Sequence, residues 1–432
     1  MSRSINRRHF LMSSAASAAL TTTVVAQDSP GNHLNLGIIG TGGRGTGVAQ
    51  AFARQANTTV THVCDVDSNH ARQAAAAVGR VDGVRQAPQA VGDLRRILDD
   101  HSVDAVYIAT PNHWHAPAAI LACAAGKHVY VEKPCSHNPR EGELLVAAAR
   151  RHDRKVQMGN QRRSFPKIQE AMAALRDGSA IGRVYLAEAW YLNTRPETGR
   201  LRDAAVPAGL DYDMWQGPAP RRPYKTNTIP YKWHWYWQWG NGEVGNNGIH
   251  MIDVMRWGLG TELPTRVTST GGRYRYVDDQ ETPDTNLVTY EFPDRKMIRW
   301  EGLSCNRYPR DTVPDVLFHG DRGSLAINGG NYTVYDASGQ EIWQENGQSS
   351  DNLHFRNFLE AVRGNARLNA EITEGAKSTM HCHLGNIAWR VGHSIACDGT
   401  TGRIQNDEPA MRHWTREYHD GWRKRLEDAA GV

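Results

Sequence analysis

The stretch GIIGTGGRG, residues 37–45, decides the fold of the N-terminal half of this 432-residue chain. It closes a short apolar run and holds the pattern Gly40-x-Gly42-x-x-Gly45. Gly40 permits a tight turn, Gly42 lets the backbone approach a pyrophosphate, and Gly45 lets a helix pack closely on a strand. The stretch predicts a strand, a phosphate-binding turn and a helix whose N-terminus attracts phosphate. The alternative is a glycine-rich turn in an unrelated α/β fold.

An aspartate after the second apolar run decides which dinucleotide we expect. Asp65 follows Gly45 by twenty residues, a distance at which an acidic side chain accepts hydrogen bonds from ribose hydroxyls. Its charge would repel a 2′-phosphate, which favours NAD. Arg44 leaves NADP open, because a guanidinium at the turn could reach such a phosphate. Thr41 and Gly43 complete the predicted cofactor turn.

Apolar runs alternate with segments of helical spacing up to about residue 160. The runs TTVTHVCDVD, VDAVYIATP, KHVYVEKP and KVQMGN predict four further strands. Strands that alternate with helices indicate an α/β fold with a doubly wound parallel sheet over residues 33–160. Residues 161–395 predict a second domain with a mixed or antiparallel sheet, because hairpin-like strands follow a helix near 246–258. We expect the tail, residues 396–432, to pack on the body.

The N-terminal stretch SINRRHFLMSSAASAALTTTVVAQ predicts a twin-arginine export signal over residues 1–26. It has paired arginines, a mildly apolar run too short for a membrane span, and a small-residue site ending at Ala26. The alternative is a disordered basic tail. The signal implies the twin-arginine translocase as a partner, a periplasmic or otherwise exported protein, and a cofactor bound before export.

Composition excludes some classes of function. Formal net charge is +4, and three of those charges are the arginines of the first ten residues, so the remainder is close to neutral and nucleic-acid binding has no electrostatic basis. Six cysteines have no C-x-x-C spacing and predict no disulfide. Thirteen tryptophans exceed what packing needs, and flat apolar rings also hold the apolar faces of sugars.

Polar residues follow the third and fourth predicted strands, where a doubly wound sheet places its ligands. ATPNHWHA brings Thr110, Pro111, Asn112 and His115 to this edge, where they could face the ribose and nicotinamide. The H-x-H pair within it has no third ligand at a metal-like spacing, so we predict no metal. VEKP adds Glu132 and Lys133. A lysine pointing into the cleft can hold a hydroxyl or carbonyl oxygen by a charge-assisted bond; the alternative is a surface lysine.

The motifs GIIGTGGRG, CDVD, ATPNHWHA, GKHVYVEKP and GNNGIHMID occur in an order and at distances that resemble the glucose–fructose oxidoreductase / inositol dehydrogenase (Gfo/Idh/MocA) family. The resemblance runs from about Leu34 to residue 395. It implies a Rossmann domain, a C-terminal domain with a large open-faced sheet through which subunits often associate as homo-oligomers, and hydride transfer between NAD(P) and a hydroxyl-bearing carbon of a sugar or cyclitol. It also implies that Lys133 is the cleft lysine, in an often cis Lys133–Pro134 bond.

The family carries Asp-x-x-x-His on a helix that faces the nicotinamide, and this sequence departs from that pattern. His250 takes the histidine position, but Asn246 stands where relatives have the aspartate. Positions four apart share a helical face, so an amide could orient the imidazole without supplying a charge. Asp253 lies three residues on and could supply part of that charge, or it could be a structural carboxylate.

The segment YKWHWYWQWGNG, residues 231–242, precedes that helix. If it is a strand, its alternation puts Trp233, Trp235, Trp237 and Trp239 on one face, where they could stack on sugar rings. The candidate substrate contacts from this segment are Lys232, His234 and Trp237. Those from the end of the fifth predicted strand are Asn160, Gln161 and Arg162. The alternative for the tryptophans is a core or a subunit interface.

Three functions remain open on these residues. The first is an exported NAD(P)-dependent oxidoreductase in which His250 removes a hydroxyl proton and Lys133 holds the reacting oxygen. The second retains NAD throughout and is redox-neutral, as a glycoside hydrolase or an epimerase, because free NAD is not expected outside the cytoplasm. The third is a non-catalytic sugar-sensing module, which Asn246 makes worth testing.

Overall fold

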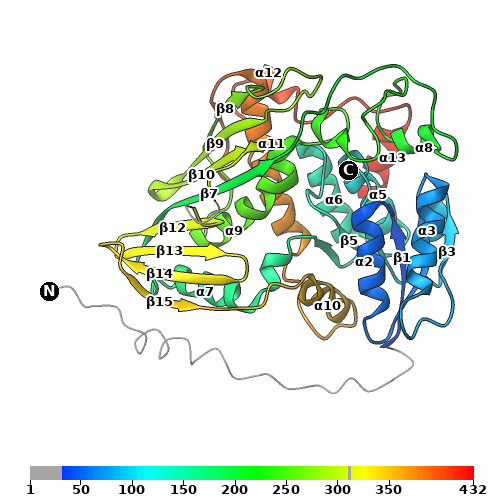
Figure 1. The fold of residues 1–432 in the computed structure, drawn as a ribbon, viewed down its shortest axis with the longest axis horizontal. Coiled ribbons are helices and arrows are strands. Elements are labelled where there is room, and N and C mark those ends of the chain that lie inside the picture. The colour runs from blue at the N-terminus through cyan, green and yellow to red at the C-terminus, as the bar shows by residue number, and fades with distance from the viewer. Residues whose placement is uncertain (1–31, 310–312) are drawn as a thin grey trace.

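A computed structural model describes residues 32–309 and 313–432 of the chain. The predicted export signal, residues 1–26, lies outside these ranges. The described residues form two sheets with helices between and around them (Figure 1). No helix within the described ranges is both long and apolar enough to span a bilayer.

The first sheet has six parallel strands in the order β3-β2-β1-β4-β5-β6, which confirms the predicted doubly wound fold. Its strands are β1 (Leu34–Ile39), β2 (Thr58–Cys64), β3 (Gln89–Val91), β4 (Ala105–Ile108), β5 (His128–Val131) and β6 (Val156–Met158). The helices that belong to this domain are α2 (Gly43–Ala53), α3 (Ser68–Gly79), α4 (Arg95–Leu98), α5 (Asn112–Ala124) and α6 (Pro139–Arg151). The sequence did not predict β3, because three partly exposed residues carry no periodicity.

Strand register aligns the residues that follow the strands. Ile39 pairs with both Cys64 and Ile108, Ile108 pairs with Val131, and Val131 pairs with Met158. The residues directly after these strand ends therefore form one row at the carboxyl edge of the sheet: Gly40, Asp65, Ala109, Glu132 and Gly159. This row is where an open parallel sheet binds its ligand.

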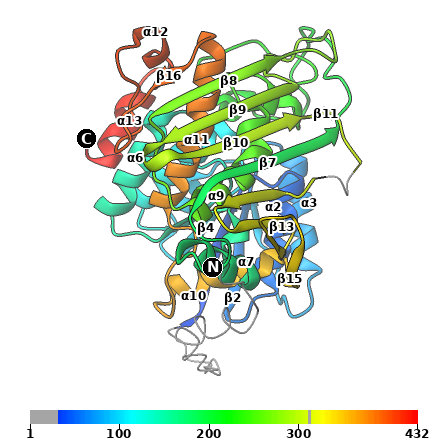
Figure 2. The ribbon, with the colours of Figure 1, turned by 90° about the vertical axis from the view of Figure 1, so that its left-hand side faces the viewer.

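The second sheet has the order β15-β14-β13-β12-β7-β10-β9-β8-β16 and is antiparallel except at the β7–β10 pair. Its strands are β7 (Val184–Thr194), β8 (Arg266–Gly272), β9 (Thr285–Phe292), β10 (Lys296–Leu303), β12 (Val316–Gly320), β13 (Gly323–Asn328), β14 (Asn331–Asp336), β15 (Glu341–Glu345) and β16 (Ile395–Ala396), with β11 (Cys305–Asn306) pairing β7 alone. Alternate residues of β9 are buried and exposed, as in a sheet with one covered face. Figure 2 shows the other face open, as the family resemblance implies.

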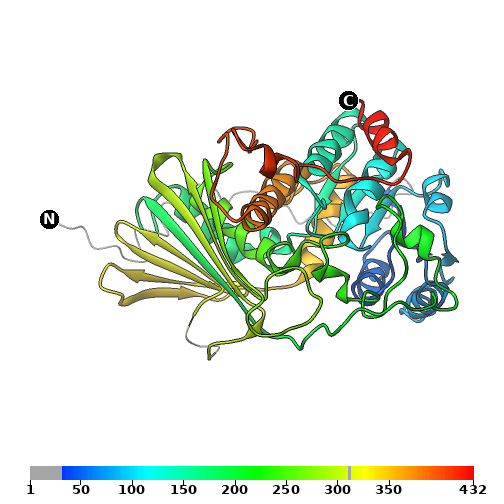
Figure 3. The same ribbon diagram turned by 90° about the horizontal axis from the view of Figure 1, so that it is seen from above.

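The covered face packs on helices that lie between the two sheets (Figure 3). These helices are α7 (Pro166–Arg176), α9 (Ile249–Leu259) and α11 (Ile372–Val391). A 3₁₀ turn, η2 (Gln161–Ser164), precedes α7. A separate 3₁₀ turn, η5 (Pro293–Arg295), connects β9 to β10. Trp300 is fully buried in this core. The core is therefore continuous from the second sheet to the first domain.

Two later segments return to the first domain. Phe355 and Phe358 of α10 (Asp351–Val362) pack against Phe52 and Tyr130. After the short helix α12 (Glu408–Met411), α13 (Trp422–Ala430) lies against α5 and α6. Its first residue, Trp422, meets Trp114 of α5 edge to face at 5.2 Å. The tail thus packs on the first domain.

Candidate active site

A cavity of about 530 Å³ lies over the carboxyl edge of the Rossmann sheet. One wall is the glycine turn with the ends of β2, β4 and β5. The other wall comes from residues 210–234 and from the start of α9. The cavity gathers most of the predicted cofactor residues, the candidate base and the candidate lysine: Gly40, Gly42, Gly43, Arg44, Asp65, Thr110, Pro111, Asn112, His115, Glu132, Lys133, Gln161, His234, Asn246 and His250. Such a concave site is large enough for a cofactor and a small substrate.

Two glycines of the turn, Gly40 and Gly45, lie where a side chain would not fit. Gly40 has φ +86°, and a Cβ there would lie 2.7 Å from the Ala109 carbonyl carbon. A Cβ on Gly45 would lie 1.9 Å from the Gly40 oxygen, so α2 could not pack on the turn. Among the described residues, nothing would lie within 4 Å of a Cβ added at Gly42 or Gly43, and no side chain caps α2. The turn is an open cradle at a helix N-terminus, and it fits a pyrophosphate.

Asp65 fixes the turn from the end of β2. Its Oδ2 accepts from the Thr41 backbone N–H at 2.8 Å and from the Thr41 hydroxyl at 3.2 Å. Its Oδ1 accepts from the Asp67 N–H at 2.9 Å. Thr41 itself is buried under the turn and does not line the cavity, and neither does Gly45. Asp65 is thus held with its carboxylate at the ribose end of the cradle.

Arg44 is held by two carboxylates rather than left free for a phosphate. Its Nε lies 3.0 Å from Glu132 Oε1, and its Nη1 lies 2.7 Å from Asp351 Oδ2. Glu132 also accepts from the Tyr107 hydroxyl at 2.8 Å. A guanidinium that already pairs with two anions is a poor ligand for a 2′-phosphate. The arrangement agrees with NAD rather than NADP.

Two orphaned polar atoms in the cavity support a bound cofactor. Thr110 Oγ1 and Asn112 Oδ1 are buried and have no hydrogen-bond partner in the described part of the chain. A buried polar atom left unpaired costs about 1–3 kcal/mol. Both residues line the cavity, so polar groups of a bound dinucleotide can satisfy them.

The two histidines near these atoms are structural. His115 Nδ1 lies 2.6 Å from the Pro134 carbonyl oxygen and its Nε2 lies 2.7 Å from that of Thr110, which ties the end of β4 to the end of β5. His113 Nε2 instead meets the Trp215 carbonyl at 2.9 Å. The two imidazole rings of the H-x-H pair therefore bond to different parts of the chain and do not face a common point. Among the residues described, no three His, Cys, Asp or Glu side chains form a metal-binding group.

Lys133 reaches across the cavity to the second domain. The Lys133–Pro134 bond is cis, as the resemblance implies. The ammonium donates to the Asn246 carbonyl at 2.6 Å and lies 3.3 Å from the Asn246 side-chain oxygen. Burial lowers the pKa of Lys133, although Glu132 and Glu243 act in the opposite direction. An ammonium has three donors, so one remains for a ligand.

His250 lies on the second-domain wall of the cavity, one helical turn after Asn246, and neither of its ring nitrogens has a partner among the described residues. The predicted helix begins as a π turn, η4 (Val244–Gly248), and becomes α-helical at Ile249. Such turns recur at functional sites. No hydrogen bond joins either His250 nitrogen to another group of residues 32–309 or 313–432. Burial, with Lys133 and Arg162 adding to it, holds the pKa of His250 well below its usual value. The imidazole is therefore neutral at pH 7 and can accept a proton.

Asn246 and Asp253 take other partners. The Asn246 amide oxygen faces Lys133, so it does not orient the His250 ring. Asp253 is buried, receives Arg163 Nε and Nη2 at 2.8 Å, and accepts from the Ser378 hydroxyl at 2.6 Å. Asp253 is therefore a structural carboxylate, which was the alternative to a role in supporting His250.

The tryptophan strand is a wrong prediction. Residues Lys232–Trp235 form a 3₁₀ helix, η3, and the next residues turn, so the four indoles do not share a face. Trp233 lines the cavity, whereas Trp235 lies under the Arg195 guanidinium at 4.9 Å. Trp239 packs on Trp215 at 4.7 Å, and Trp237 lines a different cavity. Alternation of bulky apolar residues did not produce a strand here, because each indole found a separate burial site.

Of the remaining substrate candidates, two line the cavity and three do not. Gln161 and His234 line the cavity, and His234 stacks on Trp233 at 3.5 Å with its Nδ1 bonded to the Tyr231 carbonyl. Burial lowers the pKa of His234 to about 3. Asn160, Arg162 and Lys232 lie outside the lining. Asn160 is buried, and neither its amide nitrogen nor its amide oxygen has a hydrogen-bond partner among the described residues. Arg162 pairs with Asp315 at 2.7 Å, and Lys232 donates to the Thr198 carbonyl at 2.7 Å.

Sequence reasoning named Trp233 and His234 but missed the other residues that cover the cavity. We call residues 195–235 the crossing segment; it includes α8 (Tyr212–Gln216) and runs from β7 over the Rossmann domain (Figure 1). The Ser68 N–H donates to the Gly209 carbonyl at 3.0 Å, and the Asp211 N–H donates to the Val66 carbonyl at 2.9 Å. Its lining residues are Leu210, Met214, Trp215, Ile229, Pro230, Tyr231, Trp233 and His234. A Pro- and Gly-rich stretch without periodicity gave no signal for this role.

Arg195 fastens the crossing segment to the second domain. Its Nε pairs with the buried Glu243 at 2.9 Å, and its Nη2 and Nη1 donate to the hydroxyls of Tyr191 and Tyr231 at 2.9 and 3.1 Å. The ion pair spans from the end of β7 to the π turn that precedes His250. This cluster fixes the cover relative to the candidate base.

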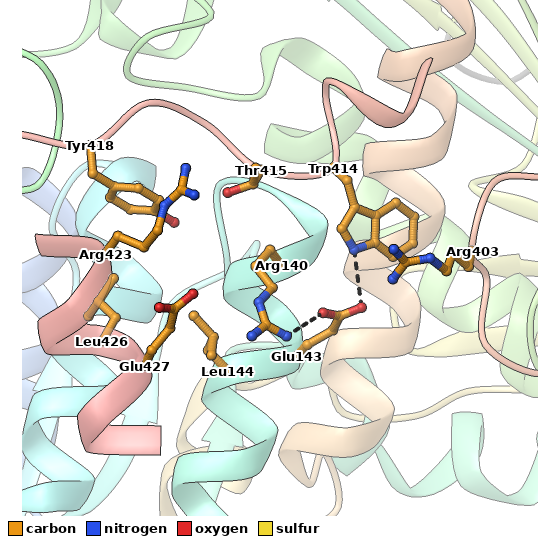
Figure 4. A pocket seen from close by; sticks show the side chains of 10 residues that line it. All are labelled: Arg140, Glu143, Leu144, Arg403, Trp414, Thr415, Tyr418, Arg423, Leu426 and Glu427. Atoms are coloured by element: carbon orange, nitrogen blue, oxygen red, sulfur yellow. Dashed lines mark hydrogen bonds and ion pairs between the residues drawn. The ribbon is translucent and has the colours of Figure 1, made fainter. Parts of the chain in front are cut away.

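A smaller cavity of about 240 Å³ lies between α6 and the C-terminal segment (Figure 4). In it Glu143 accepts from the Trp414 indole at 3.1 Å and pairs with Arg140 at 3.1 Å. None of the predicted site residues lines it.

Comparison with known proteins agrees with this geometry. Residues 34–160 match the family model described as "Oxidoreductase family, NAD-binding Rossmann fold", and residues 189–302 match "Oxidoreductase family, C-terminal alpha/beta domain", together more than half of the chain. Levoglucosan dehydrogenase of Pseudarthrobacter phenanthrenivorans is 27% identical over 320 residues, 68% of this chain and 74% of that protein.

Two further matches are more limited. A glycosyl hydrolase family 109 protein of Saccharopolyspora erythraea is 34% identical over 130 residues, but the match spans only 28% of its length. The WlbA dehydrogenase of Bordetella pertussis, solved with NADH and UDP-GlcNAcA, has the same fold at 20% identity, with a TM-score of 0.65 over 85% of this chain and 99% of that one. The chain thus belongs to the Gfo/Idh/MocA family of NAD-binding oxidoreductases.

Proposed function

We propose that the protein oxidises or reduces a hydroxyl-bearing carbon of a sugar, glycoside or cyclitol. The observation that carries the proposal is that Lys133 and the unpartnered His250 ring share one cavity with the nucleotide cradle. The names of two relatives, levoglucosan dehydrogenase and glycosyl hydrolase family 109 protein, support a carbohydrate substrate.

The residues divide the chemistry between them. NAD, when bound, supplies the exchange of hydride with the substrate carbon. The neutral His250 ring accepts the proton of the substrate hydroxyl. The free donor of Lys133 holds the same oxygen and stabilises its developing negative charge. Trp233 offers an apolar face to the sugar ring, while His234 and Gln161 bond its other hydroxyls.

Substitution of the two reacting residues tests the proposal. We expect His250→Ala and Lys133→Ala each to lower kcat by about 10²–10⁴-fold on a sugar found in a substrate panel. Both variants should keep NAD, as measured by absorbance after denaturation. His393→Asn, at an exposed histidine paired with Asp407, is the matched control and should keep full activity. Full turnover in either alanine variant contradicts the assignment, and no turnover of any sugar by the wild type favours a sensing module.

The crossing segment favours a second function, in which NAD is retained and recycled. It bonds to the Rossmann domain through backbone groups beside the cofactor cavity, one of them on the lining residue Val66, so it would slow cofactor exchange. A cofactor that stays bound suits redox-neutral chemistry, such as glycoside cleavage or epimerisation. Release of an aglycone from nitrophenyl glycosides without added NAD supports this function. A strict requirement for added NAD contradicts it.

Location and assembly are part of the proposal. The twin arginines at Arg7 and Arg8 support export through the twin-arginine translocase with NAD already bound. Replacing both by lysine should keep the protein in the cytoplasm in a fractionation experiment. The open face of the second sheet, which carries Leu287, Arg299 and Glu301, supports homo-oligomers formed through that face. Light scattering after gel filtration measures the subunit number, and a monomer contradicts this.

A further inference from the structure

A second cavity of about 530 Å³ lies behind the wall of the first and shares no lining residue with it. It is bounded by the start of α6, the C-terminal half of α11, residues 220–241 and the C-terminal segment at residues 412–417. Neither the proposed chemistry nor cofactor binding uses it. Its volume suits a mono- or disaccharide.

The cavity carries more positive than negative charge. Four arginines line it, Arg222, Arg390, Arg412 and Arg416, against the two glutamates Glu281 and Glu417. No carboxylate of the described residues pairs with Arg222 or Arg390 within 4.0 Å. Arg412 pairs with Glu408 at 3.4 Å and Arg416 pairs with Glu141 at 2.7 Å, but Nε and Nη1 of Arg416 are buried without a partner among the described residues. Arginines without a carboxylate partner favour an anionic ligand. A ligand carboxylate fits best, because a guanidinium can bind both of its oxygens at once.

Buried polar groups add acceptors to this charge. Asn241, His383 and Asn386 are more than nine-tenths buried. The Asn386 amide donates to the Asn241 carbonyl at 2.9 Å, and His383 Nε2 lies 3.0 Å from the Ser136 hydroxyl. Within the described ranges, no hydrogen bond reaches the side-chain oxygens of the two asparagines or His383 Nδ1. Such groups are positioned to bond hydroxyls rather than to pack.

The cavity also has an aromatic face. Trp237 packs on Trp389 at 5.8 Å, and the Arg390 guanidinium lies over the Trp237 ring at 5.1 Å. The backbone N–H of Trp237 donates to the Glu281 carboxylate at 2.6 Å, which fixes the main chain at this residue. An indole is suited to the apolar face of a pyranose ring, and it has no use in a site for a bare inorganic anion.

From these groups we infer that the second cavity is a binding site for a carboxylated saccharide, such as a uronic acid, separate from the catalytic cavity. The arginines bind the carboxylate, the amides and His383 bond the hydroxyls, and Trp237 covers the ring. The wall between the cavities is one short segment: Trp233 and His234 face the first, and Trp237, Gln238 and Asn241 face the second. A ligand in the second cavity therefore contacts the same segment that forms part of the wall of the first.

Titration calorimetry on the full mature chain with its NAD tests this, with galacturonate, glucuronate, galactose and sulfate as probes. We expect saturable binding of one of the two uronates, at least tenfold weaker binding of galactose, and no comparable binding of sulfate. Arg390→Gln, at an exposed arginine, should weaken uronate binding at least tenfold. Lys133→Gln should leave it unchanged, because that residue lies in the other cavity. Arg423→Gln, at the small cavity of Figure 4, is the matched arginine control.

Each other outcome overturns the inference. Loss of binding on Lys133→Gln with retention on Arg390→Gln places the acid in the catalytic cavity. Equal binding of galactose removes the role of the arginines, and equal binding of sulfate removes the role of Trp237. No heat with either uronate at millimolar concentration removes the site. Arg390→Gln should melt within about 2 °C of the wild type, which excludes misfolding as the cause of lost binding.

Discussion

The two walls of the catalytic cavity are held in place by different means. The Rossmann wall is set by strand register: residues after five paired strand ends fall in one row, and glycines let the backbone close on them. The facing wall, the crossing segment, has little regular structure and is held by scattered long-range contacts. These include the Arg195–Glu243 and Arg200–Asp279 ion pairs, the bond of His113 to the Trp215 carbonyl, and backbone bonds to the Rossmann domain. One wall depends on local geometry that a motif encodes, the other on a small number of long-range contacts.

The largest effect should come from breaking the Rossmann wall at Gly45. A Cβ in Gly45→Ala would meet the Gly40 carbonyl oxygen, which cannot move without opening the turn. We expect the free energy of unfolding to fall by about 3 kcal/mol and bound NAD to be lost. Gly47→Ala is the matched control, because Gly47 lies on the same helix, does not line the cofactor cavity and has nothing within 4 Å of its added Cβ. Chemical denaturation and the NAD content of the purified protein measure both. Equal NAD content in the two variants would mean that close packing of α2 does not form the site.

Loosening the facing wall should spare the fold and act on cofactor retention. Arg195→Gln removes the ion pair with Glu243 and the bonds to two tyrosine hydroxyls. We expect NAD to dissociate about tenfold faster, because the cover is no longer fixed to the second domain. NAD remaining after timed dialysis measures this.

Arg200→Gln controls for loss of a charge from the crossing segment, since Arg200 is exposed and its one ion pair among the described residues is with Asp279 at 2.6 Å. If both variants keep NAD as long as the wild type does, the crossing segment is not what retains the cofactor, and the redox-neutral function loses its support.

The contrast between the walls also explains what the sequence could predict. Gly40, Asp65, Asn112 and Lys133 were placed correctly because a strand end fixes where the next residue lies. Their exact partners were not predictable. Arg44, for example, is neutralised by Asp351, which lies about three hundred residues further along the chain.

The crossing segment could not be predicted, since its place depends on burial of separate side chains rather than on periodicity. The tryptophan run shows the same limit. Its alternation satisfied the strand pattern, yet Trp215 and His113 pack on Trp239, and Arg195 lies over Trp235. These contacts with distant residues favoured a turn. His250 lies between the two cases: its position on a helix was predicted, but its lack of a partner was visible only in the structure.

The smallest expected effect comes from Asn246→Asp, which tests whether a charge at position 246 changes the pKa of His250. In the wild type, burial and nearby cations hold the pKa of His250 well below 6.5, so the ring stays neutral, and activity should fall only as pH drops through that low value. Asn246→Asp places a carboxylate beside Lys133 and one turn before His250. Opposite charge favours the protonated ring, so the acid limb of the rate profile should move to higher pH by about one unit.

Stability provides a second reading of the same change. A histidine whose folded pKa is depressed binds fewer protons folded than unfolded, so it costs stability as pH falls below the unfolded value and stability rises with pH through that window. Asn246→Asp should flatten this rise in the melting temperature as pH increases toward the unfolded pKa of 6.5. Asn246→Ala, which adds no charge, should leave both profiles where they are. If the aspartate variant also leaves them unmoved, His250 is not coupled to position 246, and the base must be sought elsewhere in the cavity, with His234 next.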